Sequence, residues 1–183
     1  IMMLVAFALL ITFHNMTNTI MLQIVQRAGG ADTQMGAAVA LAAVTELIPL
    51  FMFSKLIKKF SSAGLLFTSA IFFFLKAVML FAAHSMGAIY FAQSLQMLGY
   101  GLFTPASVYY AKEAMTPDKK MQGQSLLAGA ITLGGVIGNL IGGVIIQNSG
   151  VEADLLTGVF VTLAAAALVG AFGLKRKHFP GNK

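Results

Sequence analysis

The stretch VTELIPLFMFSKLIKKFSSAGLLFTSAIFFFLKAV, residues 44–78, decides the fold. It consists of two apolar segments joined by a short basic connection, with Glu46 inside the first segment and Lys76 inside the second. A charge near the centre of a membrane helix costs about 2.5–3.5 kcal/mol on insertion scales, so it persists only with a partner or with water. The opposite signs predict that Glu46 and Lys76 either pair or line one polar cavity on a solute pathway.

The composition of the whole chain is that of a membrane protein. Of its 183 residues, 58% are hydrophobic and 10% are charged, whereas soluble domains carry about 25% charged residues. The mean hydropathy is +0.84. These values exclude a soluble helical domain, because such a domain needs polar helix faces. The absence of cysteine excludes disulfides and thiolate metal sites.

Six segments are long and apolar enough to cross a bilayer, which takes about 20 residues per helix. They cover residues 1–25, 34–53, 63–83, 86–110, 124–146 and 155–174. The expected fold class is therefore an all-α membrane protein, a bundle of six transmembrane helices. Pro49 and Pro105 lie inside the second and fourth segments and are expected to kink them. Because the chain opens at Ile1 inside an apolar segment, we interpret it as a fragment of a longer chain.

Basic residues gather in alternate connections, which predicts the orientation in the membrane. Most of the 12 basic residues follow the second, fourth and sixth segments: Lys55, Lys58 and Lys59, then Lys112, Lys119 and Lys120, then Lys175, Arg176, Lys177 and Lys183. The other connections hold Arg27, Asp32, His84, Glu152 and Asp154. The positive-inside rule places the basic connections and both ends of the chain in the cytoplasm. We therefore expect a multi-pass protein of the plasma membrane, the bacterial cytoplasmic membrane, and no nucleic-acid partner.

The fifth segment carries glycines at a spacing of four, at Gly134, Gly138 and Gly142. This spacing places them on one helix face, where two helix backbones can approach closely. We interpret the face as a site of tight helix packing; the alternative is a smooth face on which helices slide during a transport cycle. Asn139 lies in the same stretch and either faces a polar cavity or bonds to a neighbouring helix.

Uncharged polar residues recur in the first and fourth segments. His14 and Asn18 are four residues apart and share a helix face, with Asn15 beside them. This cluster indicates either a water-filled cavity or hydrogen bonding between helices. Gln93 and Gln96 are expected to face the same way, and their amides suit hydroxyl-rich or amide solutes. With Glu46 and Lys76, these residues place polar groups on each of the first four segments, which favours a solute pathway.

No metal site and no cofactor are expected. His14 has no second histidine or carboxylate at ligand spacing in its own segment, and His84 and His178 belong to connections on opposite sides. The sequence contains no phosphate-binding glycine loop and no nucleophile elbow, so we expect no enzyme activity. The alternatives from other classes are a membrane-embedded enzyme, which would need paired histidines or carboxylates, and a complete six-span channel.

The order of these features resembles the C-terminal half of a major facilitator superfamily transporter, in the oligosaccharide:proton symporter branch that includes lactose permease. The resemblance is carried by Thr45-Glu46-Leu47-Ile48, the basic connection 55–65, Ser94-Leu95-Gln96-Met97 and residues 138–150. It implies one half of a twelve-helix transporter, with the missing N-terminal six-helix half and the lipid bilayer as partners. The implied activity is proton symport of a small polar solute, a sugar or oligosaccharide, by alternating access. The alternatives are a nucleoside, an aromatic acid or a drug as solute.

The resemblance also implies roles for individual residues. The resemblance places Glu46 at the position of a glutamate that contacts sugar, and Lys76 at the position of an arginine. Lysine keeps the positive charge of that arginine but lacks its bidentate guanidinium group. The family's charged and proton-coupling residues on the next span fall on Gln93, Gln96 and Gly99. Because none of these three carries a charge, Glu46 and Lys76 are expected to be the only full charges in the interior. Proton coupling in this half would depend on them, with His14 as the other candidate.

Overall fold

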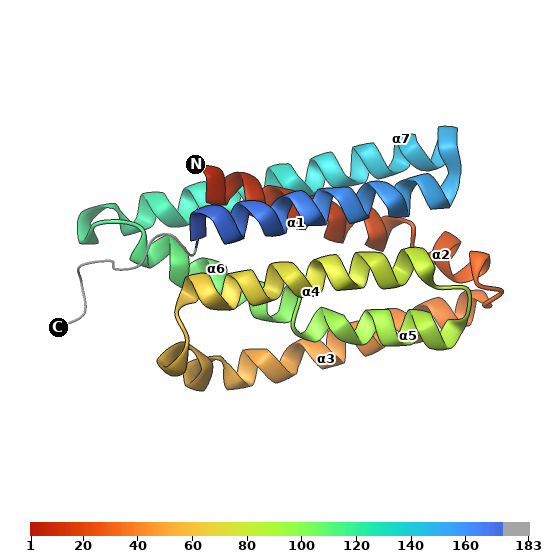
Figure 1. The fold of residues 1–183 in the computed structure, drawn as a ribbon, viewed down its shortest axis with the longest axis horizontal. Helices are drawn as coiled ribbons and strands as arrows, with labels where there is room; N and C mark the ends of the chain where they lie inside the picture. The colour runs from red at the N-terminus through yellow and green to blue at the C-terminus, as the bar shows by residue number, and fades with distance from the viewer. Residues whose placement is uncertain (174–183) are drawn as a thin grey trace.

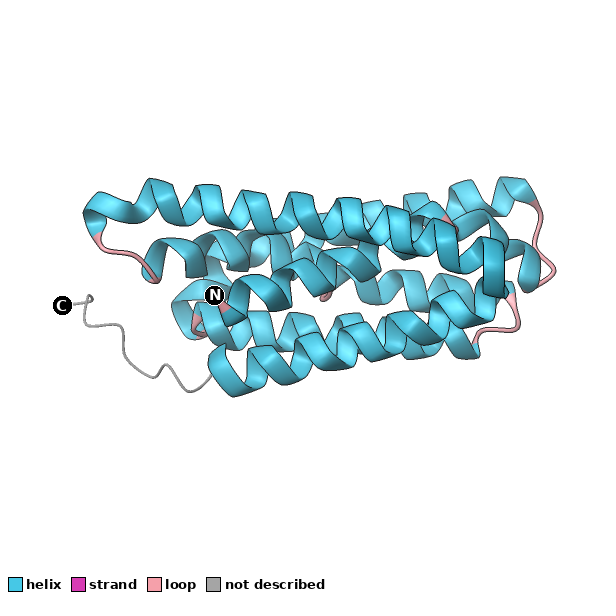
Figure 2. Ribbon diagram, turned by 90° about the horizontal axis from the view of Figure 1, so that it is seen from above, coloured by secondary structure: helices cyan, strands magenta, loops and turns pink. Residues whose placement is uncertain are grey.

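The computed structural model describes residues 1–173, and this part of the chain is helical throughout, without a strand (Figure 2). In chain order the elements are α1 (Met2–Thr19), α2 (Met21–Arg27), α3 (Asp32–Lys59), α4 (Ser62–Ala82), α5 (Met86–Ser94), η1 (Leu95–Met97), α6 (Tyr100–Glu113), η2 (Pro117–Lys119), α7 (Lys120–Leu168) and η3 (Val169–Gly173). The expected all-α class is confirmed.

Four helical stretches are long and apolar enough to cross a membrane: Met2–Thr19, Asp32–Lys59, Ser62–Ala82 and Pro117–Gly173. The last of these contains α7, which reverses direction at Gly150, where φ is 80° and ψ is −178°. Its second arm returns along the bundle beside the first (Figure 1). The fifth and sixth expected segments correspond to these two arms, and the fourth corresponds to α5, η1 and α6 together.

The helices run along the long axis of the molecule, so most connections lie at one of its two ends, whereas α5 passes into α6 in the middle (Figure 1). The α3–α4 and α6–α7 connections share one end, and the α2–α3 and α4–α5 connections lie at the other with the turn of α7. The lysines of residues 55–59 and 112–120 therefore gather at a single end. The basic residues Lys175, Arg176, Lys177 and Lys183 lie outside the described residues.

The second expected segment ends later than expected. The sequence pattern predicts a connection over residues 54–62, but α3 continues to Lys59, and Ser61 caps α4 by accepting a hydrogen bond from the backbone nitrogen of Gly64. Lys58 and Lys59 thus occupy the last turn of α3, where positive charge is favourable to the helix dipole. The basic connection is in large part the end of a helix.

The fourth expected segment is broken, although not at its proline. The helices α3 and α6 continue through Pro49 and Pro105, so these prolines end neither helix. The break falls at η1 and Gly99, where ψ is −96°. Ser69 of α4 donates a buried hydrogen bond of 2.8 Å to the carbonyl oxygen of Gly99, which provides the polar partner that a backbone break inside a membrane needs.

The glycine face of α7 packs directly on α1. Gly134, Gly138 and Gly142 meet Ala8, Thr12 and Met16 in turn. A Cβ atom on Gly138 would lie 2.4 Å from the carbonyl oxygen of Thr12, so no other residue fits without separating the helices. The hydroxyl of Thr12 also donates a hydrogen bond of 3.1 Å to the carbonyl oxygen of Gly134.

The centre of the bundle is an aromatic cluster from α1, α4 and α6. Phe103 packs edge-on against Phe7 and Phe73, with ring centroids 5.4 Å and 6.1 Å away. Large apolar side chains remain exposed on the outer helices α3 and α7, including Phe51, which is 81% exposed. Exposed apolar surface of this kind is expected where lipid covers a protein.

Candidate functional site

Three side chains from three elements form a hydrogen-bonded row inside the bundle. The ammonium group of Lys76 on α4 donates to the amide oxygen of Gln96 on η1. The amide nitrogen of Gln96 in turn donates to Oε1 of Glu46 on α3. The two charges are therefore linked through Gln96 and not by a direct ion pair, which was one of the two arrangements expected from the sequence.

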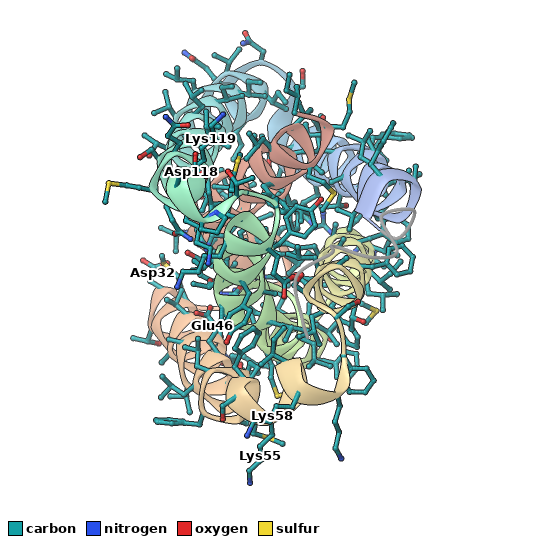
Figure 3. All side chains as sticks on the ribbon, turned by 90° about the vertical axis from the view of Figure 1, so that its left-hand side faces the viewer. Asp32, Glu46, Lys55, Lys58, Asp118 and Lys119 are labelled. Carbon is teal, nitrogen blue, oxygen red and sulfur yellow. The ribbon has the colours of Figure 1, made fainter. Side chains whose placement is uncertain are left out.

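The break in the fourth segment and one glycine bring this row together. At Gly101, α6 approaches α3 so closely that a Cβ atom there would lie 3.0 Å from the Cα atom of Glu46 and 2.9 Å from the ring of Pro49. Glu46 lies on the side of α3 that faces α6 (Figure 3). The short helix η1 turns Gln96 toward the same place. Close backbone approach at a small residue is a common way to pack membrane helices.

The row runs from a deeply buried charge to a more accessible one. Lys76 is 2% exposed and Gln96 is 6% exposed, whereas Glu46 is partly exposed. A buried ammonium group needs hydrogen-bond acceptors because it has lost its water. Gln96 serves both neighbours only in the observed orientation, with its oxygen toward Lys76 and its nitrogen toward Glu46. Oε2 of Glu46 has no hydrogen-bond partner among the described residues, and a solute hydroxyl could donate to it.

His14 lies in a second group that adjoins this row. Its ring stacks on Tyr100 of α6 with a centroid distance of 4.1 Å and an interplanar angle of 4°, and it packs edge-on against Phe73 of α4 at 6.4 Å. The amide nitrogen of Asn18 lies 3.1 Å from Nε2 of His14. Phe73 precedes Lys76 by one helical turn, so the aromatic group and the charged row share a face of α4.

The remaining candidates do not join the row. Asn15 donates to its own helix at the carbonyl oxygen of Ile11, 3.1 Å away. Asn139 accepts a hydrogen bond of 2.8 Å from Thr19 and so links α7 to α1. Gln93, expected to face the same way as Gln96, donates instead to the sulfur of Met21 at 3.2 Å, because η1 turns the two glutamines apart.

Sequence reasoning missed one residue, Asp154. The sequence pattern places it in an outer connection, but it is fully buried, at 0% exposure, on the second arm of α7. Glu46 and Lys76 are therefore not the only acidic or basic side chains in the interior, contrary to the expectation. A signal was present in the sequence: Asp154, Gly158 and Thr162 recur every four residues, and this shared face packs inward.

Within residues 1–173, neither a group of metal-ligating side chains nor the cavity at the end of the bundle coincides with the row. No group of three histidine, aspartate or glutamate side chains converges as metal ligands within residues 1–173. A cavity of about 530 Å³ lies at the end of the bundle where α1 begins, lined mainly by apolar residues that include Met3, Phe7 and Phe172. None of the sequence-predicted site residues lines it, so its position does not support a role in binding a polar solute.

Comparison with known proteins gives one match at the level of a family. A sequence model described as the Major Facilitator Superfamily matches residues 3–183, nearly the whole chain. A comparison with curated proteins gave no match.

Proposed function

The chain belongs to the Major Facilitator Superfamily, whose members are multi-pass secondary transporters and normally not enzymes, and on this premise we propose that it carries a small polar solute. The proposed solute class is a sugar or oligosaccharide, moved with protons by alternating access. In this proposal residues 1–183 are the C-terminal six-helix half of a twelve-helix transporter, with its lysine-rich end in the cytoplasm. Such halves rock against each other around a site near the middle of the membrane.

The observation that carries the proposal is the row formed by Glu46, Gln96 and Lys76. Charges and amides inside a membrane bundle are costly and mark solute or ion pathways. In this row the carboxylate is the accessible member, and it offers acceptor oxygens to the hydroxyl groups of a solute. Lys76 supplies the balancing charge through Gln96. In this proposal the carboxylate of Glu46 therefore keeps a hydrogen-bond partner and a counter-charge even when no solute is bound.

The aromatic group beside the row supports a ring-shaped solute. His14 and Tyr100 present a stacked pair, and aromatic faces pack well against the apolar faces of sugar rings as well as against flat rings. The sugar is favoured over an aromatic acid because Glu46 would repel a second carboxylate. Glu46 would therefore be the solute ligand, and His14 and Tyr100 would form an apolar wall.

Uptake into proteoliposomes containing the full-length protein tests this function. A panel of labelled sugars, nucleosides and aromatic acids is offered with an inwardly directed proton gradient. We expect a sugar to accumulate, the Glu46→Gln variant to abolish accumulation, and the control Glu152→Gln, at an exposed position, to retain it. Accumulation of another class alone would reject the sugar, and wild-type uptake by Glu46→Gln would remove Glu46 from the mechanism.

A further inference from the structure

Asp154 is a buried carboxyl group that the proposed solute site does not use. It lies four residues after the turn at Gly150, on the second arm of α7, and it is fully buried. Glu152, two residues earlier on the same arm, is exposed. The helix thus turns one of its two carboxylates toward solvent or lipid headgroups and the other into the bundle.

The surroundings of Asp154 are apolar and closely packed. A Cβ atom on Gly142 would lie 3.4 Å from Oδ1 of Asp154 and 2.7 Å from the side chain of Met16. One turn further along the second arm, Gly158 packs on Phe13 and Met16 of α1. The carboxyl group therefore lies where α1 meets both arms of α7, against the glycine face that holds these helices together.

Neither oxygen of Asp154 has a hydrogen-bond partner among the described residues. On the helices packed against α7, the ring of His14 stacks on Tyr100, Lys76 donates to Gln96, and Glu113 accepts from Ser62. Lys112, Lys120 and Glu152 are exposed. Arg27 donates through Nη2 to the carbonyl oxygens of Phe81 and Ala83, while its Nε and Nη1 have no hydrogen-bond partner among the described residues. Residues 1–173 also contain no cluster of metal-ligating side chains.

An ionised carboxylate without a partner is too costly to keep in an apolar interior, and such a group takes up a proton instead. We propose that Asp154 is a proton-binding site of this transporter, distinct from the solute site at Glu46. The carboxyl group holds a proton while α1 and the two arms of α7 are packed together. When the helices separate and water reaches the carboxyl group, it releases the proton and becomes a carboxylate; no other reactant is needed.

The glycine face gives this site a way to open. The side chain of Met16 lies against Gly142 beside Asp154. Small residues let helix backbones approach closely, and a face without side chains has none that would block a shift of α1 along α7. Proton binding at Asp154 thus favours the arrangement in which α1 is packed on α7. This inference rests on the proposed transport only for its coupling role, whereas proton binding itself is a property of the folded protein.

Infrared spectroscopy on the full-length protein tests proton binding without any solute. The carbonyl stretch of a protonated carboxylic acid is separate from the bands of carboxylates. We expect such a band at neutral pH in the wild type, its loss in Asp154→Asn, and its retention in the control Glu152→Gln. An unchanged band in Asp154→Asn would overturn the proposal. If the asparagine variant folds poorly, Asp154→Leu removes the carboxyl group without leaving a polar side chain and is expected to lose the same band.

A transport measurement then tests coupling. We expect Asp154→Asn to keep solute exchange between the two sides of the membrane but to lose accumulation driven by a proton gradient. Wild-type accumulation by Asp154→Asn would overturn the coupling role. The two proposals fail separately: if the wild type takes up none of the tested sugars, the proposed solute class is wrong, and the infrared comparison still decides whether Asp154 holds a proton.

Discussion

The amide oxygen of Gln96 accepts a hydrogen bond from the buried ammonium group of Lys76. The same amide donates to Glu46, so an uncharged side chain connects the two charges that stand out in the sequence. A change in the charge or position of Glu46 would alter the hydrogen bond between Gln96 and Lys76, because the same amide group bonds to both side chains. The stability of the folded protein and the behaviour of the proposed solute site are therefore expected to depend on one glutamine.

Replacement of Gln96 by leucine is expected to destabilise the protein. Lys76 would lose its hydrogen-bond acceptor at a position that is 2% exposed, and an unsatisfied buried charge costs about 3 kcal/mol. The matched control is Gln93→Leu, because Gln93 is equally buried and donates only to the sulfur of Met21. Thermal unfolding of the full-length protein in detergent measures both; equal losses in the two variants would contradict the role given to Gln96.

A double-mutant cycle on Glu46 and Lys76 is expected to be non-additive. Lys76→Ala leaves Glu46 without its counter-charge, and Glu46→Ala leaves Lys76 unbalanced, so Lys76→Ala should be less stable than the double variant. The interaction energy is expected to lie between about 0.5 and 3 kcal/mol. It should shrink in a Gln96→Leu background, because the amide links the two groups. If the two single substitutions have additive effects on thermal unfolding when Gln96 is present, Glu46 and Lys76 are not coupled through the row.

Alanine at Gly138 is expected to push α1 away from α7. The new Cβ atom would lie 2.4 Å from the carbonyl oxygen of Thr12, and overpacking of this kind costs about 1–3 kcal/mol. Gly143→Ala is the control, because a Cβ atom there meets nothing within 4 Å and alanine favours a helix. Unfolding in graded detergent mixtures compares them, and a loss in the control as large as in Gly138→Ala would argue against the packed face.

Alanine at Gly150 is expected to strain the turn of α7. With φ at 80° and ψ at −178°, the backbone lies in a region that is essentially restricted to glycine, at a cost of about 1–3 kcal/mol for other residues. No atom lies within 4 Å of the added Cβ atom, so any loss of stability comes from the backbone alone. Gly129→Ala, also without neighbours but inside the helix, should melt at the wild-type temperature or above it, because alanine favours a helix. A tolerated Gly150→Ala would contradict the observed turn.

Several parts of the fold follow from local properties of the sequence. Hydropathy and segment length predict the helices, because each backbone polar group in a membrane must be satisfied within its own helix. The regular spacing of Gly134, Gly138 and Gly142 predicts a face for close packing, and the structure gives α1 as its partner. The positions of the lysines predict that two connections share one end of the bundle, where Figure 1 places them.

The sites depend on tertiary structure for a physical reason. A side chain's neighbours across a helix interface are set by how helices cross and where they break, and one sequence contains no measure of either. The break at Gly99 separates Gln93 from Gln96, which helical spacing had placed together. The chain reverses at Gly150 and is helical again directly afterwards. Asp154 therefore lies on a helix inside the bundle and not in the connection that the sequence predicts.

The sequence by itself thus determined that this chain is an all-helical membrane protein with two charges, Glu46 and Lys76, inside it. Only the tertiary structure decided that Gln96 joins those charges and that Asp154 is a further buried carboxyl group. Hydrophobicity is a property of each residue and is read along the chain, whereas the partner of a polar group is a property of two helices, fixed only once they pack.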